Sequence, residues 1–297
     1  MTIVAGERVE QTRARYPDSE GYVERDSVRV FYEVYGQGEP TILLPPPWAI
    51  VYSRVWKMQI PYFARHFRVV VYDGRGNGRS DRPGSADAYG EREQAADALA
   101  ILDATATEQA IVVGFSWGGQ WSLILAAEHP ERVKAVCFLG AGPGLAGEPF
   151  PYEAYPFDDE LGTDEGWAKE NRNYWLRDWP GYVEWFFSQC FTEPHSTKQI
   201  EDAVGWGLET TAETMLLTED APTIDPDEAR ELCGRLTCPI LVVHGDEDAI
   251  VPHAKAVALA EATGGRLATF DGSGHCPQLR DPVRFNLRLR EFVESVA

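Results

Sequence analysis

Short apolar runs alternate along most of the chain with segments whose apolar residues recur at helical spacing. The valine-rich runs "FRVVVYD" (67–73), "AIVVGF" (110–115) and "PILVVHGD" (239–246) are typical of buried strands. The segment "EREQAADALAILDAT" (91–105) instead has the spacing of an amphipathic helix. This alternation predicts an α/β domain, with a parallel sheet covered by helices on both faces. Near the N-terminus, "VRVFYEVYG" (28–36) indicates one arm of a hairpin at the edge of the sheet.

The alternating part of the chain also contains a helix-like stretch at 54–65. The alternation of strands and helices stops near residue 143. The segment that follows interleaves acidic residues with aromatic ones, among them Trp167, Trp175, Trp179, Trp185 and Trp206. We expect a helical insertion there, which divides the chain into three parts. Residues 1–142 form the first part of the core, 143–224 the insertion and 225–297 the second part of the core.

Composition and charge narrow the classes of function. The chain has 297 residues and a formal net charge of −20, which argues against binding nucleic acid or an anionic membrane surface. No stretch has the length of a membrane span, and the N-terminal segment lacks the apolar core of a signal peptide. The five cysteines have no framework spacing, so we expect reduced thiols in a cytoplasmic protein.

The strongest chemical signal is "GFSWG" (114–118), which matches G-x-S-x-G between a predicted strand and a predicted helix. Glycines at the flanking positions allow a turn too tight for larger side chains. Such a turn raises the Ser116 hydroxyl above the edge of the sheet, where the N–H groups of the next helix also point. The alternative is a glycine-rich turn with an incidental serine.

A serine hydroxyl needs a base to become a good nucleophile at neutral pH. Of the six histidines, His275 has the best position, in the loop "FDGSGHCPQLRDP" between the last strand and the last helix. An imidazole base in turn needs a carboxylate that fixes its tautomer and stabilises its cation. The loop "HGDEDAIVP", after the preceding core strand, offers Asp246, Glu247 and Asp248. The order of serine, acid and histidine is the one expected on this scaffold.

With these motifs in this order, the chain resembles the α/β-hydrolase fold family of serine hydrolases from about residue 22 to 296. The resemblance rests on "YDGRGNGRSDRP", "GFSWGG", "HGDEDAIVP" and "GSGHCPQLRDP". It implies a mostly parallel eight-stranded sheet, a helical cap at 143–224 and no metal or organic cofactor. In the family's acid loop the catalytic aspartate stands three residues after a glycine. That position is Asp248 here, after Gly245, with Asp246 as the alternative.

One loop departs from the family pattern. The strand before the first long helix usually leads into a His-Gly pair, and the loop after it donates one N–H to the oxyanion hole. Here the corresponding sequence is "LLPPPW" (43–48), whose three prolines have no N–H to donate. We therefore expect the oxyanion donors to be the backbone N–H groups of Trp48 and Trp117. The alternative is that the loop only packs and that Ala49 or a later residue donates.

These features predict a cytoplasmic serine hydrolase that cleaves an acyl bond, most simply a carboxylic ester, through an acyl-enzyme on Ser116. The aromatic residues favour a small apolar or aromatic substrate, and the residues expected to contact it are Trp48, Phe115, Trp175 and Trp179. Aromatic side chains on helices are, however, as often core as pocket.

Other readings stay open on the same triad: hydrolysis of a carbon–carbon bond, perhydrolase chemistry, acyl transfer, or a ligand sensor with little turnover. The expected partner is a small-molecule substrate, without nucleic acid or membrane, and a homodimer is compatible with the chain.

Overall fold

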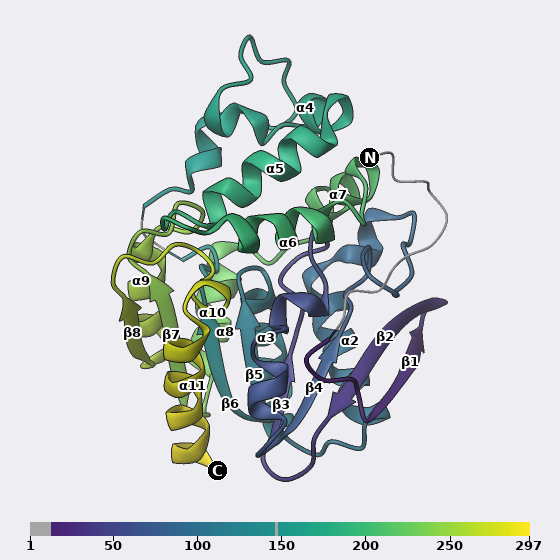
Figure 1. The fold of residues 1–297 in the computed structure, drawn as a ribbon, viewed down its shortest axis with the longest axis vertical. Coiled ribbons are helices and arrows are strands. Elements are labelled where there is room, and N and C mark those ends of the chain that lie inside the picture. The colour runs from purple at the N-terminus through teal and green to yellow at the C-terminus, as the bar shows by residue number, and fades with distance from the viewer. Residues whose placement is uncertain (1–12, 146–147) are drawn as a thin grey trace.

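The computed structural model describes residues 13–145 and 148–297. Residues 1–12 of the expected first core part and residues 146–147 of the expected insertion lie outside this description. One eight-stranded sheet runs through the described chain (Figure 1). Its strands are β1 (Ser19–Arg25), β2 (Val28–Tyr35), β3 (Thr41–Leu44), β4 (Arg68–Tyr72), β5 (Ala110–Phe115), β6 (Val133–Leu139), β7 (Ile240–Gly245) and β8 (Arg266–Phe270).

The sheet has the strand order β1-β2-β4-β3-β5-β6-β7-β8. The pairs β1/β2 and β2/β4 are antiparallel, and the remaining neighbours are parallel. The sequence-based prediction of a mostly parallel eight-stranded sheet with a hairpin at one edge is confirmed. Strand β5 lies in the middle of the sheet and pairs with β6 through Phe115 and Leu139, so the residue that follows β5 emerges at the centre of the sheet edge.

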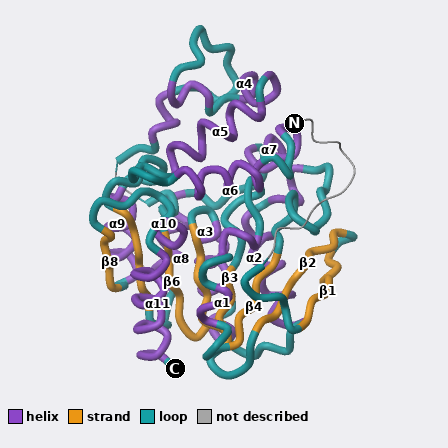
Figure 2. Tube along the Cα trace, in the orientation of Figure 1, coloured by secondary structure: helices purple, strands orange, loops and turns teal. Residues whose placement is uncertain are grey.

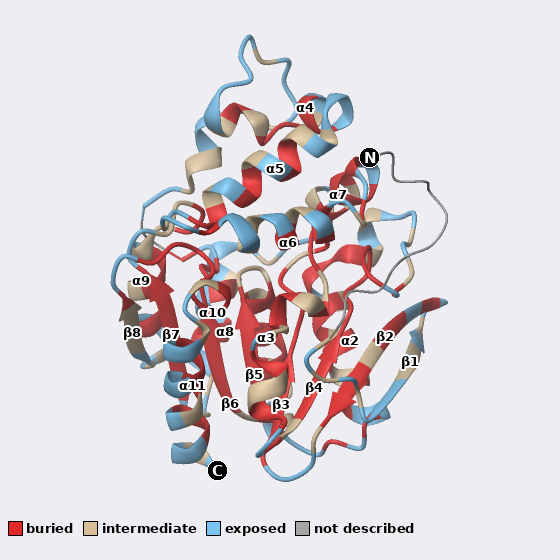
Figure 3. Ribbon diagram, viewed as in Figure 1, coloured by how far each residue is buried: buried red, intermediate tan, exposed pale blue. Residues whose placement is uncertain are grey.

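Helices cover both faces of the sheet, as Figure 2 shows. Alternate residues of β5 explain this arrangement, because Val112 and Val113 belong to different hydrophobic clusters. Val113 packs with apolar residues of α1 (Ile60–Phe63) and α11 (Pro282–Val296). The cluster that contains Val112 draws on four helices, namely α2 (Glu91–Ala104), α3 (Gly118–Glu128), α8 (Pro226–Arg235) and α9 (His253–Thr263). Figure 3 shows that the central strands are buried throughout.

The predicted helix at 54–65 is only partly correct. The chain forms a 3₁₀ turn at Ser53–Trp56 and then the single-turn helix α1. Pro61 stands in the first turn of α1, where proline is tolerated, but in the interior of one continuous helix it would remove a hydrogen bond. The Trp56 indole N–H also donates to the Pro45 carbonyl at 2.9 Å, which ties the turn to the proline loop.

Residues 148–224 hold the helices α4 (Arg172–Arg177), α5 (Trp179–Cys190), α6 (Thr197–Gly207) and α7 (Ala212–Glu219). Figure 1 shows this group beyond one end of the sheet, in teal and green. Side-chain caps define where three of these helices begin: Asn171 accepts from the Asn173 and Tyr174 N–H groups, Asp178 from the Gly181 N–H and Thr211 from the Thr214 N–H. Within the described residues, no helix is both long enough and apolar enough to cross a membrane.

Candidate active site

Ser116 lies in a tight turn between β5 and α3, with a φ of 52°. The turn depends on the two glycines of the motif. A Cβ atom on Gly114 would lie 2.4 Å from the Ser122 Oγ, and one on Gly118 would lie 2.8 Å from the Pro46 carbonyl oxygen. The Ser116 N–H donates to the Leu139 carbonyl at 2.8 Å, which anchors the turn on β6. The sequence therefore folds locally so that the serine side chain stands above the sheet edge.

His275 approaches Ser116 from the loop between β8 and the short helix α10 (Pro277–Arg280). Its Nε2 lies 3.1 Å from the Ser116 Oγ, within hydrogen-bond reach. The backbone N–H of His275 donates to the Cys190 carbonyl at 3.1 Å, so the end of helix α5 helps to hold the loop. The imidazole is 3% exposed, which limits competition from water. This geometry suits a base that removes the serine proton.

Asp248 completes the arrangement on the other side of the imidazole. Its Oδ2 lies 2.8 Å from His275 Nδ1, and its Oδ1 accepts from the N–H groups of Ile250 and Val251 at 2.8 and 2.9 Å. The side chain is completely buried. Burial alone would raise its pKa, but the charge of His275 and hydrogen bonds from His244 and His275 hold the pKa of Asp248 well below its usual range. The carboxylate therefore stays ionised.

The alternative acid, Asp246, has a different environment. It is exposed, and its Oδ1 accepts from the Gly272 N–H. It therefore braces the loop that carries His275 instead of contacting the imidazole. The structure brings Ser116, His275 and Asp248 together and leaves Asp246 outside this chain of hydrogen bonds.

His244 takes a part that the sequence did not indicate. It ends β7 fully buried, and its Nε2 lies 2.8 Å from the Val251 carbonyl oxygen and 3.2 Å from Asp248 Oδ2. A packing role fits its burial, but the residue also supports the carboxylate that faces His275. The available signal was its place at the end of a buried strand, directly before the acid loop.

The loop with three prolines packs against the serine turn. The rings of Trp48 and Trp117 are stacked with centroids 6.4 Å apart, and the Trp48 indole N–H donates to Thr218 of α7 at 3.0 Å. The Trp117 backbone N–H donates to no other group among the described residues, whereas Trp48 forms an isolated antiparallel bridge with Val51. Both residues line a cavity that reaches Ser116, and the Trp117 N–H is available for an external acceptor.

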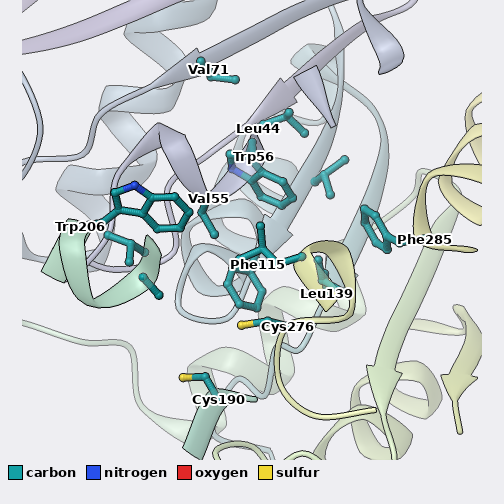
Figure 4. Close-up of a cluster of buried hydrophobic side chains, with 14 of the residues drawn as sticks. Leu44, Val55, Trp56, Val71, Phe115, Leu139, Cys190, Trp206, Cys276 and Phe285 are labelled. Carbon is teal, nitrogen blue, oxygen red and sulfur yellow. The ribbon is translucent and has the colours of Figure 1, made fainter. Parts of the chain in front are cut away.

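Ser116 lies between two cavities of unequal size. The larger, of about 430 Å³, extends from Ser116 under the helical insertion. The smaller, of about 40 Å³, lies on the His275 side and has an almost wholly apolar lining. Its lining residues include Val55, Phe115, Phe187, Trp206, Cys276 and Leu279, several of which are labelled in Figure 4.

The four expected substrate contacts separate into two groups. Trp48 lines both cavities and Phe115 lines the smaller one. Trp175 and Trp179 are not among the lining residues of either cavity, which corrects the prediction for them. Trp175 is fully buried and packs on Trp48 and Trp179, with ring centroids 6.2 and 5.8 Å apart. These rings form the core of the insertion, where burying a large aromatic surface stabilises the packing.

The described residues contain no group of three or more His, Cys, Asp or Glu side chains placed to hold a metal ion. What the arrangement offers is a serine, an imidazole and an ionised carboxylate in sequence, beside the unpartnered N–H of Trp117. That set is suited to nucleophilic attack on a carbonyl carbon.

The fold and this constellation define an α/β hydrolase, and comparison with known proteins agrees. A sequence model of the alpha/beta hydrolase fold family matches residues 40–189. The chain therefore belongs to the alpha/beta hydrolase fold family. The family is one of hydrolytic enzymes.

Among individual proteins, the chain is similar to the 2-hydroxymuconate semialdehyde hydrolase of Pseudomonas sp. (strain CF600). The two are 30% identical over 241 residues, which cover 80% of each chain. A solved structure described as Est816, an N-acyl homoserine lactone degrading enzyme, is 29% identical with a TM-score of 0.73, over 92% of this chain and all of that one. A bromoperoxidase from Bacillus anthracis shares the fold, with a TM-score of 0.78 at 21% identity over 93% and 100% of the two chains.

Proposed function

We propose that this protein is a serine hydrolase that cleaves a carboxylic ester through an acyl-enzyme on Ser116. The observation that carries the proposal is the continuous hydrogen-bonded chain from Asp248 through His275 to the Ser116 Oγ, with separations of 2.8 and 3.1 Å. The pKa of Asp248 lies well below its usual range, so an ionised carboxylate faces the imidazole at neutral pH.

In the first half of the reaction His275 accepts the Ser116 proton through Nε2 while Oγ attacks the ester carbonyl carbon. The tetrahedral oxyanion takes hydrogen bonds from the Trp117 and Trp48 N–H groups, each of which contributes about 2.7–4 kcal/mol of transition-state stabilisation. His275 then gives the proton to the departing alcohol. Asp248 stays ionised and stabilises the imidazolium throughout.

In the second half a water molecule replaces the alcohol. His275 removes its proton, and the resulting nucleophile attacks the acyl-enzyme. The second tetrahedral intermediate then collapses to the carboxylic acid while His275 returns the proton to the departing Ser116 Oγ. No metal or organic cofactor takes part in this scheme, because the protein's own residues supply the base, the nucleophile and the oxyanion donors.

A second candidate is hydrolysis of a carbon–carbon bond on the same three residues. The similarity to the semialdehyde hydrolase, over four fifths of both chains, favours this reading. One feature weakens it: the larger cavity has no Lys, Arg or His among its described lining residues, so it lacks a cation to pair with a carboxylate such as a muconate-type substrate carries.

A panel of p-nitrophenyl esters with short acyl chains, run beside a β-diketone-like substrate, tests the proposal. We expect repeated turnover of the esters and slower cleavage of the diketone. Faster cleavage of the diketone would establish the second candidate instead. A single turnover of every compound, with the acyl group retained, would contradict both and favour a ligand sensor.

A further inference from the structure

The larger cavity has a chemical character that the hydrolysis of a simple ester does not explain. Four of its described lining residues are glutamates, namely Glu91, Glu153, Glu170 and Glu219. None of its described lining residues is basic, and many of the others are aromatic. These carboxyl groups therefore lie beside aromatic rings in the same space into which the Ser116 hydroxyl opens.

Glu170 is the most informative of these carboxylates. Glu170 is only 9% exposed, and one of its carboxylate oxygens, Oε2, accepts from the Tyr182 hydroxyl at 2.6 Å. Its other carboxylate oxygen has no hydrogen-bond or ion-pair partner among the described residues, although the residue lines the cavity. A buried carboxylate without a countercharge is costly, so a ligand that supplied one would bind favourably.

Glu219, at the end of α7, adds a second unpaired carboxylate. It lines the same cavity and has no ion pair within the described chain, and its charge acts on Glu170. The nearby guanidinium of Arg172 is already paired with Asp158 and Asp220 on the outside of the insertion. The Lys255 ammonium donates to the Leu145 carbonyl and lies over the ring of Phe150. Neither cation forms an ion pair with the two glutamates, although the charge of Arg172 acts on Glu219.

Aromatic rings line the wall beside these carboxylates. Phe150 and Tyr152 are stacked with centroids 5.2 Å apart, and Tyr152 lies 6.1 Å from Trp167. The charges of Glu219 and Glu170 both act on the Tyr152 hydroxyl, which places the rings and the carboxylates in one neighbourhood. Ring faces attract cations, and the attraction grows when the site excludes water.

Resting on the serine hydrolase function proposed above, we infer that the substrate carries an ammonium group, bound by Glu170 and Glu219 against Tyr152 and Trp167. The 40 Å³ apolar cavity on the other side of Ser116 accepts a short alkyl or acyl group. The substrate class is thus an ester with a small apolar part on one side of the carbonyl and a cationic part on the other. The net charge of −20 favours the approach of such a molecule.

The ionisation of the glutamates gives this specificity a pH dependence. Burial first, and then the charge of Glu219, raise the pKa of Glu170 to about 8, against the opposing hydrogen bond from Tyr182. Burial and Asp220 raise the pKa of Glu219 to about 7, opposed by Arg172. Raising the pH removes protons from both carboxyls and makes them negative. The preference for a cation should therefore increase as the pH rises through about 7 to 8.

Pairs of esters with the same shape and different charge test the inference. One pair is butyrylcholine and 3,3-dimethylbutyl butanoate, with the cation on the alcohol. The other is methyl 4-(trimethylammonio)butanoate and methyl 5,5-dimethylhexanoate, with the cation on the acyl side. In at least one pair we expect kcat/KM to be roughly 10–100-fold higher for the cationic member. Because protonation of His275 affects both members alike, the ratio within a pair isolates the binding site.

Matched variants locate the effect. Glu170→Gln and Glu219→Gln should each lower the charge preference and weaken its rise with pH, and the double variant should lower both further, with only the contribution of Glu91, Glu153 and the aromatic rings left. Glu184→Gln, an exposed position on α5, is the control and should keep the wild-type ratio. A ratio of one or less in both pairs at every pH, with the neutral esters still turned over, would overturn this inference and leave the serine hydrolase function standing.

Binding provides a readout that needs no turnover. In calorimetry with Ser116→Ala protein, the cationic ester of at least one pair should bind more tightly than its neutral isostere. At pH 7 its binding should also release protons from the cavity glutamates, detected as a dependence of the binding heat on the buffer. Equal affinity for the two esters would overturn the inference even if no ester were hydrolysed.

Discussion

Two regions of this protein bury carboxylates and treat them in opposite ways. In the acid loop after β7, burial of Asp248 is more than offset by hydrogen bonds and the charge of His275, and its pKa falls well below the usual range. In the wall of the larger cavity Glu170 is also buried, yet its pKa rises to about 8. The difference is the set of partners. Asp248 accepts from two backbone N–H groups and from histidine, whereas Glu170 accepts from one tyrosine hydroxyl.

The comparison shows that burial alone does not determine the charge of a carboxyl group. A carboxylate whose donors are built into the fold is ionised before any substrate arrives, which suits a residue that must stabilise an imidazolium. A carboxyl group without such donors gains its countercharge only from a ligand, which suits a residue that selects that ligand.

The largest effect should come from the nucleophile that the two regions serve. Ser116→Ala should lower kcat for a p-nitrophenyl ester on the order of 10⁶-fold, because both steps of the acyl-enzyme route disappear. Steady-state kinetics measures the loss, and an unchanged circular dichroism spectrum shows that the fold persists. Activity within 10-fold of wild type, on the order of 1 kcal/mol in the barrier, would exclude Ser116 as the nucleophile.

The acid loop should come next. Asp248→Asn removes the charge that stabilises His275 and favours the wrong tautomer, so kcat should fall about 10⁴-fold. Asp246→Asn is the matched control on the same loop, and its loss should be much smaller because Asp246 accepts from Gly272 rather than from the imidazole. Equal losses in the two variants, or a larger loss for Asp246→Asn, would contradict the assignment of Asp248 as the residue that orients His275.

The oxyanion donor of the proline loop should have an intermediate effect. Trp48→Ala keeps the backbone N–H and removes the indole, while Trp48→Pro removes the N–H as well. If the N–H stabilises the oxyanion, the proline variant should lose roughly 10²–10³-fold in kcat beyond the alanine variant. Binding of a boronate transition-state analogue gives a direct readout. Equal affinity in the two folded variants would assign the second donor to Ala49 or a later residue.

The smallest effect concerns stability, and its sign should differ between the two regions. The folded-state pKa of Glu170 is raised above its unfolded value, so the folded protein loses stability as the pH rises from about 4.5 to 8. Glu170→Gln has no carboxyl group to ionise and avoids this loss. Its free energy of unfolding should exceed that of the wild type by about 1–3 kcal/mol at pH 8 and differ little at pH 5.

Asp248 has the opposite linkage. Because its pKa is lower in the folded state, Asp248 contributes stability above the unfolded-state pKa of 3.8. That stability is lost as the pH falls from this value toward the lower folded-state pKa. Asp248→Asn should therefore destabilise the protein at neutral pH. Urea unfolding of both variants at pH 5 and pH 8 measures the two signs. The same sign for both at pH 8 would refute the contrast between the regions.

The fold and the serine turn could be predicted because local sequence determines them. Alternating apolar runs specify the sheet, and Gly114 and Gly118 are required where a Cβ would clash. His275 and Asp248 could be placed by the order of their loops along the chain. The division of the stretch at 54–65 into two short turns was missed, because its helix-like composition does not reveal how the Trp56 indole binds the proline loop.

The cap was harder to interpret than the sheet edge. Trp175 and Trp179 have the composition of pocket residues but pack into the insertion, since nothing in the sequence distinguishes an inward from an outward face in a helix rich in aromatics. Glu170 and Glu219 lie 49 positions apart in an acidic segment and resemble solvated charges. Only their burial beside one cavity separates them from the many exposed carboxylates around them.

The central claim is that Ser116 is the residue that becomes acylated, and the site of covalent modification tests it most directly. Wild-type protein is treated with a fluorophosphonate, digested and mapped by peptide mass spectrometry, with Ser116→Ala treated in parallel. If Ser116 is the nucleophile, a single phosphonyl adduct forms on Ser116 of the wild type and none on the variant. An adduct on another residue, or equal labelling of the variant, would contradict it.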